Sequence, residues 1–138
     1  MPADIELEIT ETIYAEEPEI INEKCRDLQS LGFRIAMDDF GSGYSSLNML
    51  KEMPLDIIKM DLRFLSAEGD IKQAEKGRNI LRTLIELAHT LELEVVVEGV
   101  ETAEQRDFLL EIGKCRAQGY FYSRPVSCAD FEYLLPGA

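Results

Sequence analysis

The chain has 138 residues, of which 46% are hydrophobic, so it is long enough and apolar enough to bury one core. Its formal net charge of −13 argues against a surface for DNA or RNA, because such a surface needs clustered Lys and Arg. No apolar run approaches the about 20 residues that cross a bilayer, and the first residues lack a secretory signal, so we expect a cytoplasmic protein without a membrane segment.

Predicted strands and helices alternate along the chain. The first strand alternates apolar and polar residues, and the later strands are short apolar runs. The helical segments have recognisable ends, such as Pro18 and Gly32 around the first one. The predicted strands are residues 5–10, 33–37, 56–60, 94–97 and 117–121. The predicted helices are residues 18–31, 45–53, 71–91, 102–112 and a last one from about 127.

This alternation predicts an α/β fold with a parallel sheet. The strands are spaced roughly as in βα units of about thirty residues, which implies right-handed crossovers. No linker, low-complexity stretch or shift in composition divides the chain. We therefore predict a single domain over residues 1–138 with about five parallel βα units.

Polar side chains, most of them carboxylates, lie at the end of every predicted strand. The carboxyl ends of parallel strands meet at one edge of a sheet, where α/β folds build their sites. Alternation places Glu8 on the polar face of its strand, and it places Lys59 and Asp61 on one face of theirs. The strand-end residues are Glu8 and Glu11, Asp38 and Asp39, Lys59 and Asp61, and Glu98 and Glu101, while Gln118 lies in the fifth strand.

Such side chains suit a metal-dependent site for phosphodiesters. Crowded carboxylates repel one another unless protons or cations relieve the repulsion. Oxygen ligands without His or Cys favour Mg²⁺ or Mn²⁺, and adjacent residues such as Asp38 and Asp39 suit two ions about 4 Å apart. Lys59 can orient a water molecule or offset charge on a phosphate. Gly41 and Gly43 allow the next loop to close tightly over a ligand.

Taken singly, each of these features has a plainer explanation. Asp38 and Asp39 can form a turn or a helix cap, and Lys59 with Asp61 can be a simple ion pair. Glu101 can be the acidic start of a helix, which the helix dipole favours. The interpretation as a metal site depends on all of them sharing one edge of the sheet.

The remaining reactive residues favour no other chemistry. Cys25, Cys115 and Cys128 are odd in number and widely spaced, so we expect reduced thiols rather than disulfides or a zinc site. His89 is the only histidine and lies in a predicted helix. A Ser-His-Asp or Cys-His mechanism would depend on it alone, so we disfavour both.

The sequence also resembles a known family, through motifs that span nearly the whole chain. It is similar to the EAL domain, the phosphodiesterase that linearises the bacterial messenger cyclic di-GMP. The motifs occur in the family's order, and as a set they are highly specific. They are residues 7–11 (LEITE), 38–47 (DDFGSGYSSL), 58–61 (IKMD), 97–102 (VEGVET), 118–120 (QGY) and 123–125 (SRP).

The resemblance implies a TIM-like barrel that binds cyclic di-GMP together with Mg²⁺ or Mn²⁺. By the family's pattern, Glu8, Asp38 and Asp39 look like metal ligands. Asp61 looks like a further acid of the metal site, and Glu98 looks like a residue that contacts both the metal and the water.

The same resemblance implies roles beyond metal binding. Lys59 looks like the lysine at the hydrolytic water, Glu98 like the general base, and Gln118 like the glutamine near the attacking water. Glu101 resembles the glutamate that anchors the loop 40–46, which in the family shapes the metal site and the dimer interface.

The chain departs from the family's pattern in two ways. A closed (β/α)8 barrel takes about 250 residues, whereas about five strands are predicted here. The sequence lacks the Glu-Ala-Leu strand, the strand with a metal-binding asparagine and the usual substrate-binding arginine. Strands 5–10 and 117–121 would form open sheet edges, so we expect self-association or a missing upstream segment. In addition, Cys115 stands where the family often has an aspartate.

Two functions therefore stay open. The first is metal-dependent hydrolysis of cyclic di-GMP to the linear dinucleotide, weak or absent in the chain as it stands. The second is an inactive EAL-like module that binds cyclic di-GMP or a partner protein. The polar strand ends favour the first function, and the missing strands favour the second. Metal-dependent turnover separates them.

Overall fold

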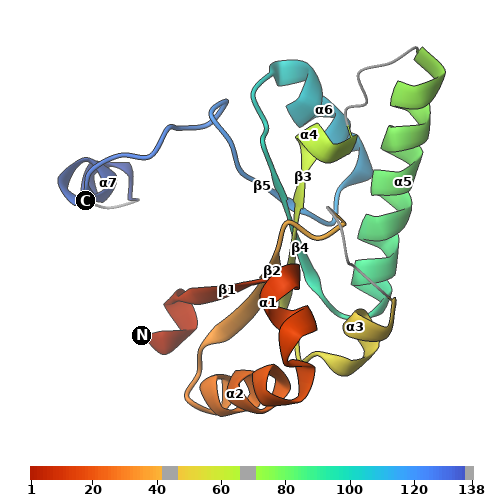
Figure 1. Cartoon of the computed structure of the whole chain (residues 1–138). Coiled ribbons are helices and arrows are strands. Elements are labelled where there is room, and N and C mark those ends of the chain that lie inside the picture. Colours follow the sequence, from red (N-terminus) through yellow and green to blue (C-terminus); the bar gives the residue numbers. More distant parts are fainter. Residues whose placement is uncertain (42–46, 66–70, 136–138) are drawn as a thin grey trace.

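The computed structural model describes residues 1–41, 47–65 and 71–135, and a parallel sheet lies at its centre (Figure 1). The sheet has five strands in the order β1-β2-β3-β4-β5, so each strand lies beside the next one in the chain. This arrangement confirms the predicted α/β fold with a parallel sheet. The strands are β1 (Glu6–Thr10), β2 (Arg34–Asp38), β3 (Ile57–Asp61), β4 (Glu94–Glu98) and β5 (Arg116–Ala117).

Helices join the strands, and two short ones directly follow β1 and β3 where none was predicted. In Figure 1, α5 runs along the sheet whereas α7 lies apart from it. No helix in the described ranges is long and apolar enough to cross a membrane. The predicted helix 45–53 begins in residues outside the described ranges. The helices are α1 (Glu11–Glu16), α2 (Pro18–Ser30), α3 (Leu47–Glu52), α4 (Leu62–Leu65), α5 (Ile71–Thr90), α6 (Ala103–Ile112) and α7 (Cys128–Leu134), after a 3-10 turn at Pro2–Asp4.

The fifth strand is shorter than predicted, because the chain turns away from the sheet after Gln118. The backbone N–H of Gln118 still donates to the carbonyl of Val97 at 2.8 Å, but that of Phe121 donates to the carbonyl of Val100 at 3.0 Å. A Cβ at Gly119 would lie 2.2 Å from the Val100 carbonyl oxygen, so only glycine fits there. The prediction of a strand over 117–121 is therefore wrong beyond its first residue.

The outer face of the sheet forms the main core with the helices. Alternate residues of each strand point to this face, as the period of a strand requires. Ile35 and Met37 of β2 are fully buried, and Val97 of β4 is too. The long helix α5 contributes Leu81 and Ile85 to the same cluster. This packing fixes β2, β3 and β4, and so it fixes the positions of the site residues at their carboxyl ends.

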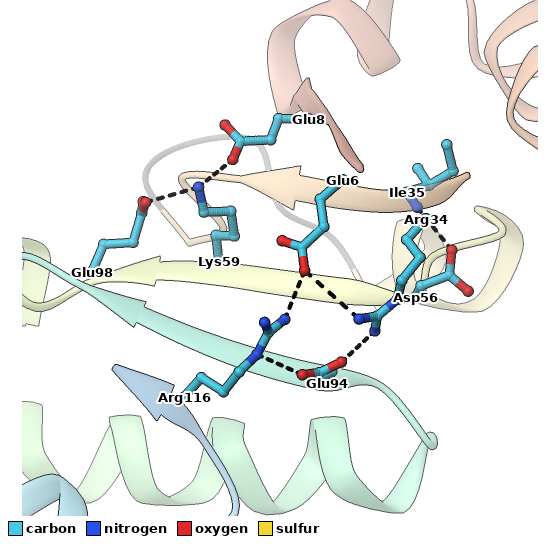
Figure 2. A network of polar contacts seen from close by, with 9 residues as sticks. All are labelled: Glu6, Glu8, Arg34, Ile35, Asp56, Lys59, Glu94, Glu98 and Arg116. Carbon is cyan, nitrogen blue, oxygen red and sulfur yellow. Dashed lines mark hydrogen bonds and ion pairs between the residues drawn. The ribbon is translucent and has the colours of Figure 1, made fainter. Parts of the chain in front are cut away.

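The inner face carries a cluster of ion pairs near the beginning of the strands, drawn in Figure 2. Glu6, Arg34, Glu94 and Arg116, which we call the basal ion-pair cluster, come from β1, β2, β4 and β5. Arg116 Nη2 lies 2.9 Å from Glu6 Oε1, and both arginines also contact Glu94. The first and the fifth strand are thus joined by their side chains, which requires a strongly curved sheet.

A small apolar layer separates the basal ion-pair cluster from the polar strand ends. Ala36, Ile57 and Val96 form this layer and are buried. Strand register places Ala36 beside Ile57 and places Val96 beside Arg116. Farther along the same face lie Lys59 and its carboxylate partners (Figure 2). The inner face is therefore polar, apolar and polar again, from the beginning of the strands to their carboxyl ends.

Candidate functional site

Lys59 is the central residue of the carboxyl-end site. It lies in the fully buried part of β3, and only 5% of it is exposed. Its Nζ donates to Glu8 of β1 and lies 2.9 Å from Glu98 Oε1 of β4 (Figure 2). The plain ion pair with Asp61 that the sequence left open is not the arrangement found here. Lys59, on β3, instead joins Glu8 of β1 to Glu98 of β4.

These contacts set the charge of Lys59 and Glu98. Burial alone would lower the pKa of Lys59, but hydrogen bonds to the two carboxylates and their negative charges outweigh it and raise the pKa to about 12. Lys59 is therefore a permanent cation at physiological pH. Burial raises the pKa of Glu98, and the Lys59 ammonium opposes that rise. Glu98 is thus more basic than an ordinary glutamate, as a proton acceptor near neutral pH should be.

Asp38, Asp39 and Glu98 can share one cation. Each offers an oxygen, and these atoms lie within 4.8 Å of one another. Asp38 ends β2, and Asp39 begins the following turn in the left-handed region, at φ 52°, which Asp tolerates better than most residues. Burial and then the charges of Asp38 and Asp61 raise the pKa of Asp39. A bound cation would relieve that repulsion.

The other two predicted ligands have protein partners in this structure. Glu8 pairs with Lys59, and Asp61 pairs with Arg63. The Arg63 hydrogen bond lowers the pKa of Asp61, so this carboxylate is held ionised. Arg63 was not singled out from the sequence, although it lies only two residues beyond Asp61. Metal binding by Glu8 and Asp61 stays a prediction.

The turn after Asp39 is held by Glu11. Glu11 is only 5% exposed at the start of α1, and its Oε1 accepts a hydrogen bond from the Gly41 N–H at 2.9 Å. The sequence placed Glu11 at a strand end but gave it no role. Glu101, the anchor implied by the resemblance, is exposed at the cleft margin. The contact shown for the Gly41 N–H is with Glu11, and the anchoring role of Glu101 stays a prediction.

One cleft of about 320 Å³ contains all the predicted site residues. Gln118 reaches it from the turn after β5, where its backbone carbonyl accepts a hydrogen bond from Val100 N–H at 3.1 Å. The predicted gathering of strand-end residues is therefore found. The residues around the cleft are Glu8, Asp38, Asp39, Lys59, Asp61, Arg63, Glu98, Gly99, Glu101, Gln118, Gly119 and Tyr120.

Comparison with known proteins gives the same family as the motifs. The family model described as "EAL domain" matches residues 1–125. The chain is 40% identical over 137 residues to the cyclic di-GMP phosphodiesterase RocR of Pseudomonas aeruginosa, covering 99% of this chain and 34% of RocR. It is 37% identical over 134 residues to the signaling protein YkoW of Bacillus subtilis, covering 97% of this chain and 16% of YkoW. The chain thus spans well under two thirds of either relative.

Solved structures are similar over nearly the whole chain. The EAL domain of Mycobacterium smegmatis DcpA has a TM-score of 0.84 and 35% identity, and the match covers 98% of this chain and 59% of that one. A manganese and cyclic di-GMP complex of Klebsiella pneumoniae BlrP1 has a TM-score of 0.78 and 32% identity, covering 90% of this chain and 31% of BlrP1. EAL domains are TIM barrels, so the five strands correspond to part of a barrel. This chain belongs to the EAL domain family.

Proposed function

We propose that this chain binds cyclic di-GMP and divalent metal in the carboxyl-end cleft and takes part in hydrolysis of the dinucleotide to its linear form. The observation that carries the proposal is the convergence of Asp38, Asp39 and Glu98 beside the buried Lys59. The similarity to RocR and to the BlrP1 complex supports the choice of substrate.

The carboxylates fit a hard divalent cation. Asp38, Asp39 and Glu98 supply only oxygen atoms, which is the donor set for Mg²⁺ or Mn²⁺. Such an ion, when bound, neutralises phosphate charge and makes water a better nucleophile. The pKa of Asp39 is raised by burial and then by the charges of Asp38 and Asp61, so a bound cation would favour its charged form. Glu8 and Asp61 remain candidate ligands within the same cleft.

Lys59 and Glu98 have complementary roles in this proposal. Lys59 keeps its proton because its pKa is about 12, so it can donate to an anionic oxygen but cannot accept a proton. Glu98 has a raised pKa and lines the same cleft, so it can accept a proton from the attacking water. Gln118 lines the same cleft and would orient that water.

Binding without turnover is the second candidate. The chain covers 34% of RocR and 31% of BlrP1, so much of either relative has no counterpart in this sequence. The strand order leaves β1 and β5 at the edges of the sheet, where further strands can pair. We propose that a second copy or an upstream segment supplies them, and that the chain works in the cytoplasm. Without such strands we expect weak turnover or none.

Hydrolysis of cyclic di-GMP by the purified chain tests the proposal. The reaction is followed with Mg²⁺ and with Mn²⁺, and Asp38→Asn is the control because it removes one charge from the carboxylate group. Turnover that needs metal and is lost in the control supports the enzyme. Metal-dependent binding without turnover supports the binding module. If the chain shows neither binding nor turnover, the proposal is overturned.

A further inference from the structure

Arg63 is a second cation in the acidic cleft. The described lining residues include six carboxylates, namely Glu8, Asp38, Asp39, Asp61, Glu98 and Glu101, but only two cations, Lys59 and Arg63. Lys59 is buried and already contacts Glu8 and Glu98. The Arg63 side chain is 76% exposed. It is therefore the accessible cation for a ligand that enters this cleft with a negative charge.

Asp61 holds the Arg63 guanidinium in a defined orientation. The Arg63 side chain donates from Nε to Asp61 Oδ1 at 3.1 Å and from Nη2 to Oδ2 at 2.6 Å. The backbone N–H of Arg63 also donates to Asp61 Oδ1 at 2.8 Å, which fixes the start of α4. Within the part of the chain that the structure describes, Nη1 makes no hydrogen bond or ion pair. A paired arginine with unused N–H groups can bind a phosphate without leaving its carboxylate.

The wall of the cleft is shaped around this pair. Gly99 follows Glu98 with a φ of 77°, and a Cβ there would lie 3.0 Å from Asp61 Oδ1 and 3.7 Å from Arg63 Nε. A side chain at position 99 would therefore crowd Asp61 Oδ1 and touch Arg63 Nε. Gly99 also borders the cleft itself. The pair is thus part of the wall of the cleft, in contrast to an ion pair on an open helix surface.

We propose that Arg63 is a phosphate-binding residue of this cleft. Asp61 orients the guanidinium, and its remaining N–H groups donate to oxygens of a phosphodiester of cyclic di-GMP. The planar guanidinium suits phosphate geometry better than an ammonium does. This inference rests on the proposed function, because it assigns a contact to the same ligand. The bland alternative is that Arg63 serves only to neutralise Asp61.

Binding measurements on charge variants test this assignment. Cyclic di-GMP is titrated calorimetrically into the parent chain, Arg63→Gln and Arg63→Lys with Ca²⁺ present, because a BlrP1 complex contains calcium together with the dinucleotide. Arg78→Gln is the matched control, since Arg78 is an exposed arginine on α5 that pairs with Glu104. We expect about tenfold weaker binding in Arg63→Gln and an intermediate loss in Arg63→Lys. Arg78→Gln should bind as the parent does.

The affinity for Mn²⁺ alone separates the two explanations. A phosphate contact leaves Mn²⁺ affinity in Arg63→Gln within about twofold of the parent. Equal dinucleotide affinity in the parent and Arg63→Gln would overturn the assignment of Arg63 but leave the proposed function standing. Weaker dinucleotide binding with an equally large change in Mn²⁺ affinity would overturn it too, because Arg63 would then act through the carboxylates. A parent chain that binds no cyclic di-GMP would overturn the proposed function as well.

Discussion

The buried carboxylate of Glu11 accepts a hydrogen bond from the backbone N–H of Gly41 at 2.9 Å, across 30 residues of sequence. It joins the start of α1 to the turn that follows the two aspartates. The position of Asp39 therefore depends on a residue from a neighbouring strand end. A carboxylate that binds a backbone N–H is a strong and directional partner.

Loss of the Glu11 carboxylate should loosen this turn. We expect Glu11→Ala to lower the free energy of unfolding by about 1–3 kcal/mol, because the half-buried Gly41 N–H would lose this charged acceptor. It should also weaken Mn²⁺ binding, since Asp39 would be less well positioned. Urea unfolding and Mn²⁺ titration measure the two effects. Glu16→Ala, at the exposed end of the same helix, is the control. Equal Mn²⁺ affinity in Glu11→Ala and the parent would contradict the positioning role.

Replacement of Lys59 by an apolar residue should leave two carboxylates facing each other. Lys59→Met removes the cation between Glu8 and Glu98 and so raises the pKa of Glu98 further. Because the Glu8 side chain is 45% exposed, we expect a modest loss of about 1–3 kcal/mol in the free energy of unfolding. Any turnover of cyclic di-GMP should be lost. Thermal unfolding and the hydrolysis assay measure these outcomes.

The exposed Lys51 of α3 provides the matched control for that substitution. Lys51→Met removes the same charge from the chain at a distance from the cleft. It should leave both stability and turnover near those of the parent. If the two variants behave alike, the contacts of Lys59 have no special energetic importance.

The raised pKa of Asp39 gives a stability difference that depends on pH. The folded chain binds a proton at Asp39 more tightly than the unfolded chain, so it loses stability as the pH rises from 3.8 through the raised pKa. We expect metal-free Asp39→Asn to melt at a higher temperature than the parent near neutral pH. The difference should shrink as the pH falls below 3.8. Asparagine tolerates the left-handed backbone at this position, so the substitution adds little strain.

Bound metal should reverse the order of the melting temperatures of the parent and Asp39→Asn. Mn²⁺ is expected to raise the melting temperature of the parent more than that of Asp39→Asn, because the variant lacks one ligand oxygen with a charge. Asp27→Asn on α2 controls for the loss of one negative charge. An equal shift with Mn²⁺ in the parent and Asp39→Asn would show that Asp39 does not bind the ion.

The basal ion-pair cluster should contribute through coupling between β1 and β5. Glu6→Gln and Arg116→Gln each remove one side of the contact at 2.9 Å, and the double variant removes both. Since both side chains are partly exposed, we expect a coupling energy of about 0.5–1 kcal/mol that falls at high salt. Urea unfolding of the four proteins gives this value. A coupling of zero at low salt would mean that the contact does not hold the strands together.

Much of the fold was predictable because the strands follow simple rules. Alternation in β1 predicted its position and the face that its side chains occupy, and the apolar runs predicted the positions of β2 and β4. The gathering of Asp38 and Glu98 followed from the parallel arrangement, because the ends of parallel strands meet at one edge.

The remaining features depend on contacts that sequence periodicity does not encode. The strand at β5 ends early because Gly119 approaches the Val100 backbone, which is distant in sequence. The role of Glu11 appears only when the turn at Gly41 is placed beside α1. Arg63 lies in a short helix whose start is fixed by Asp61, and four residues are too few for a helical pattern to show.

The contact between Glu6 and Arg116 also bears on how the chain is made. The two residues are separated by 110 positions, so the basal ion-pair cluster cannot close until Arg116 has been synthesised. At the usual rate of translation, Glu6 waits roughly 5–20 s for its partner. During that interval β1 can pair with β2, but Val96 of the inner apolar layer lacks Arg116 beside it. We therefore expect the inner face of the nascent chain to stay open to proteases and chaperones at least until β5 has been made.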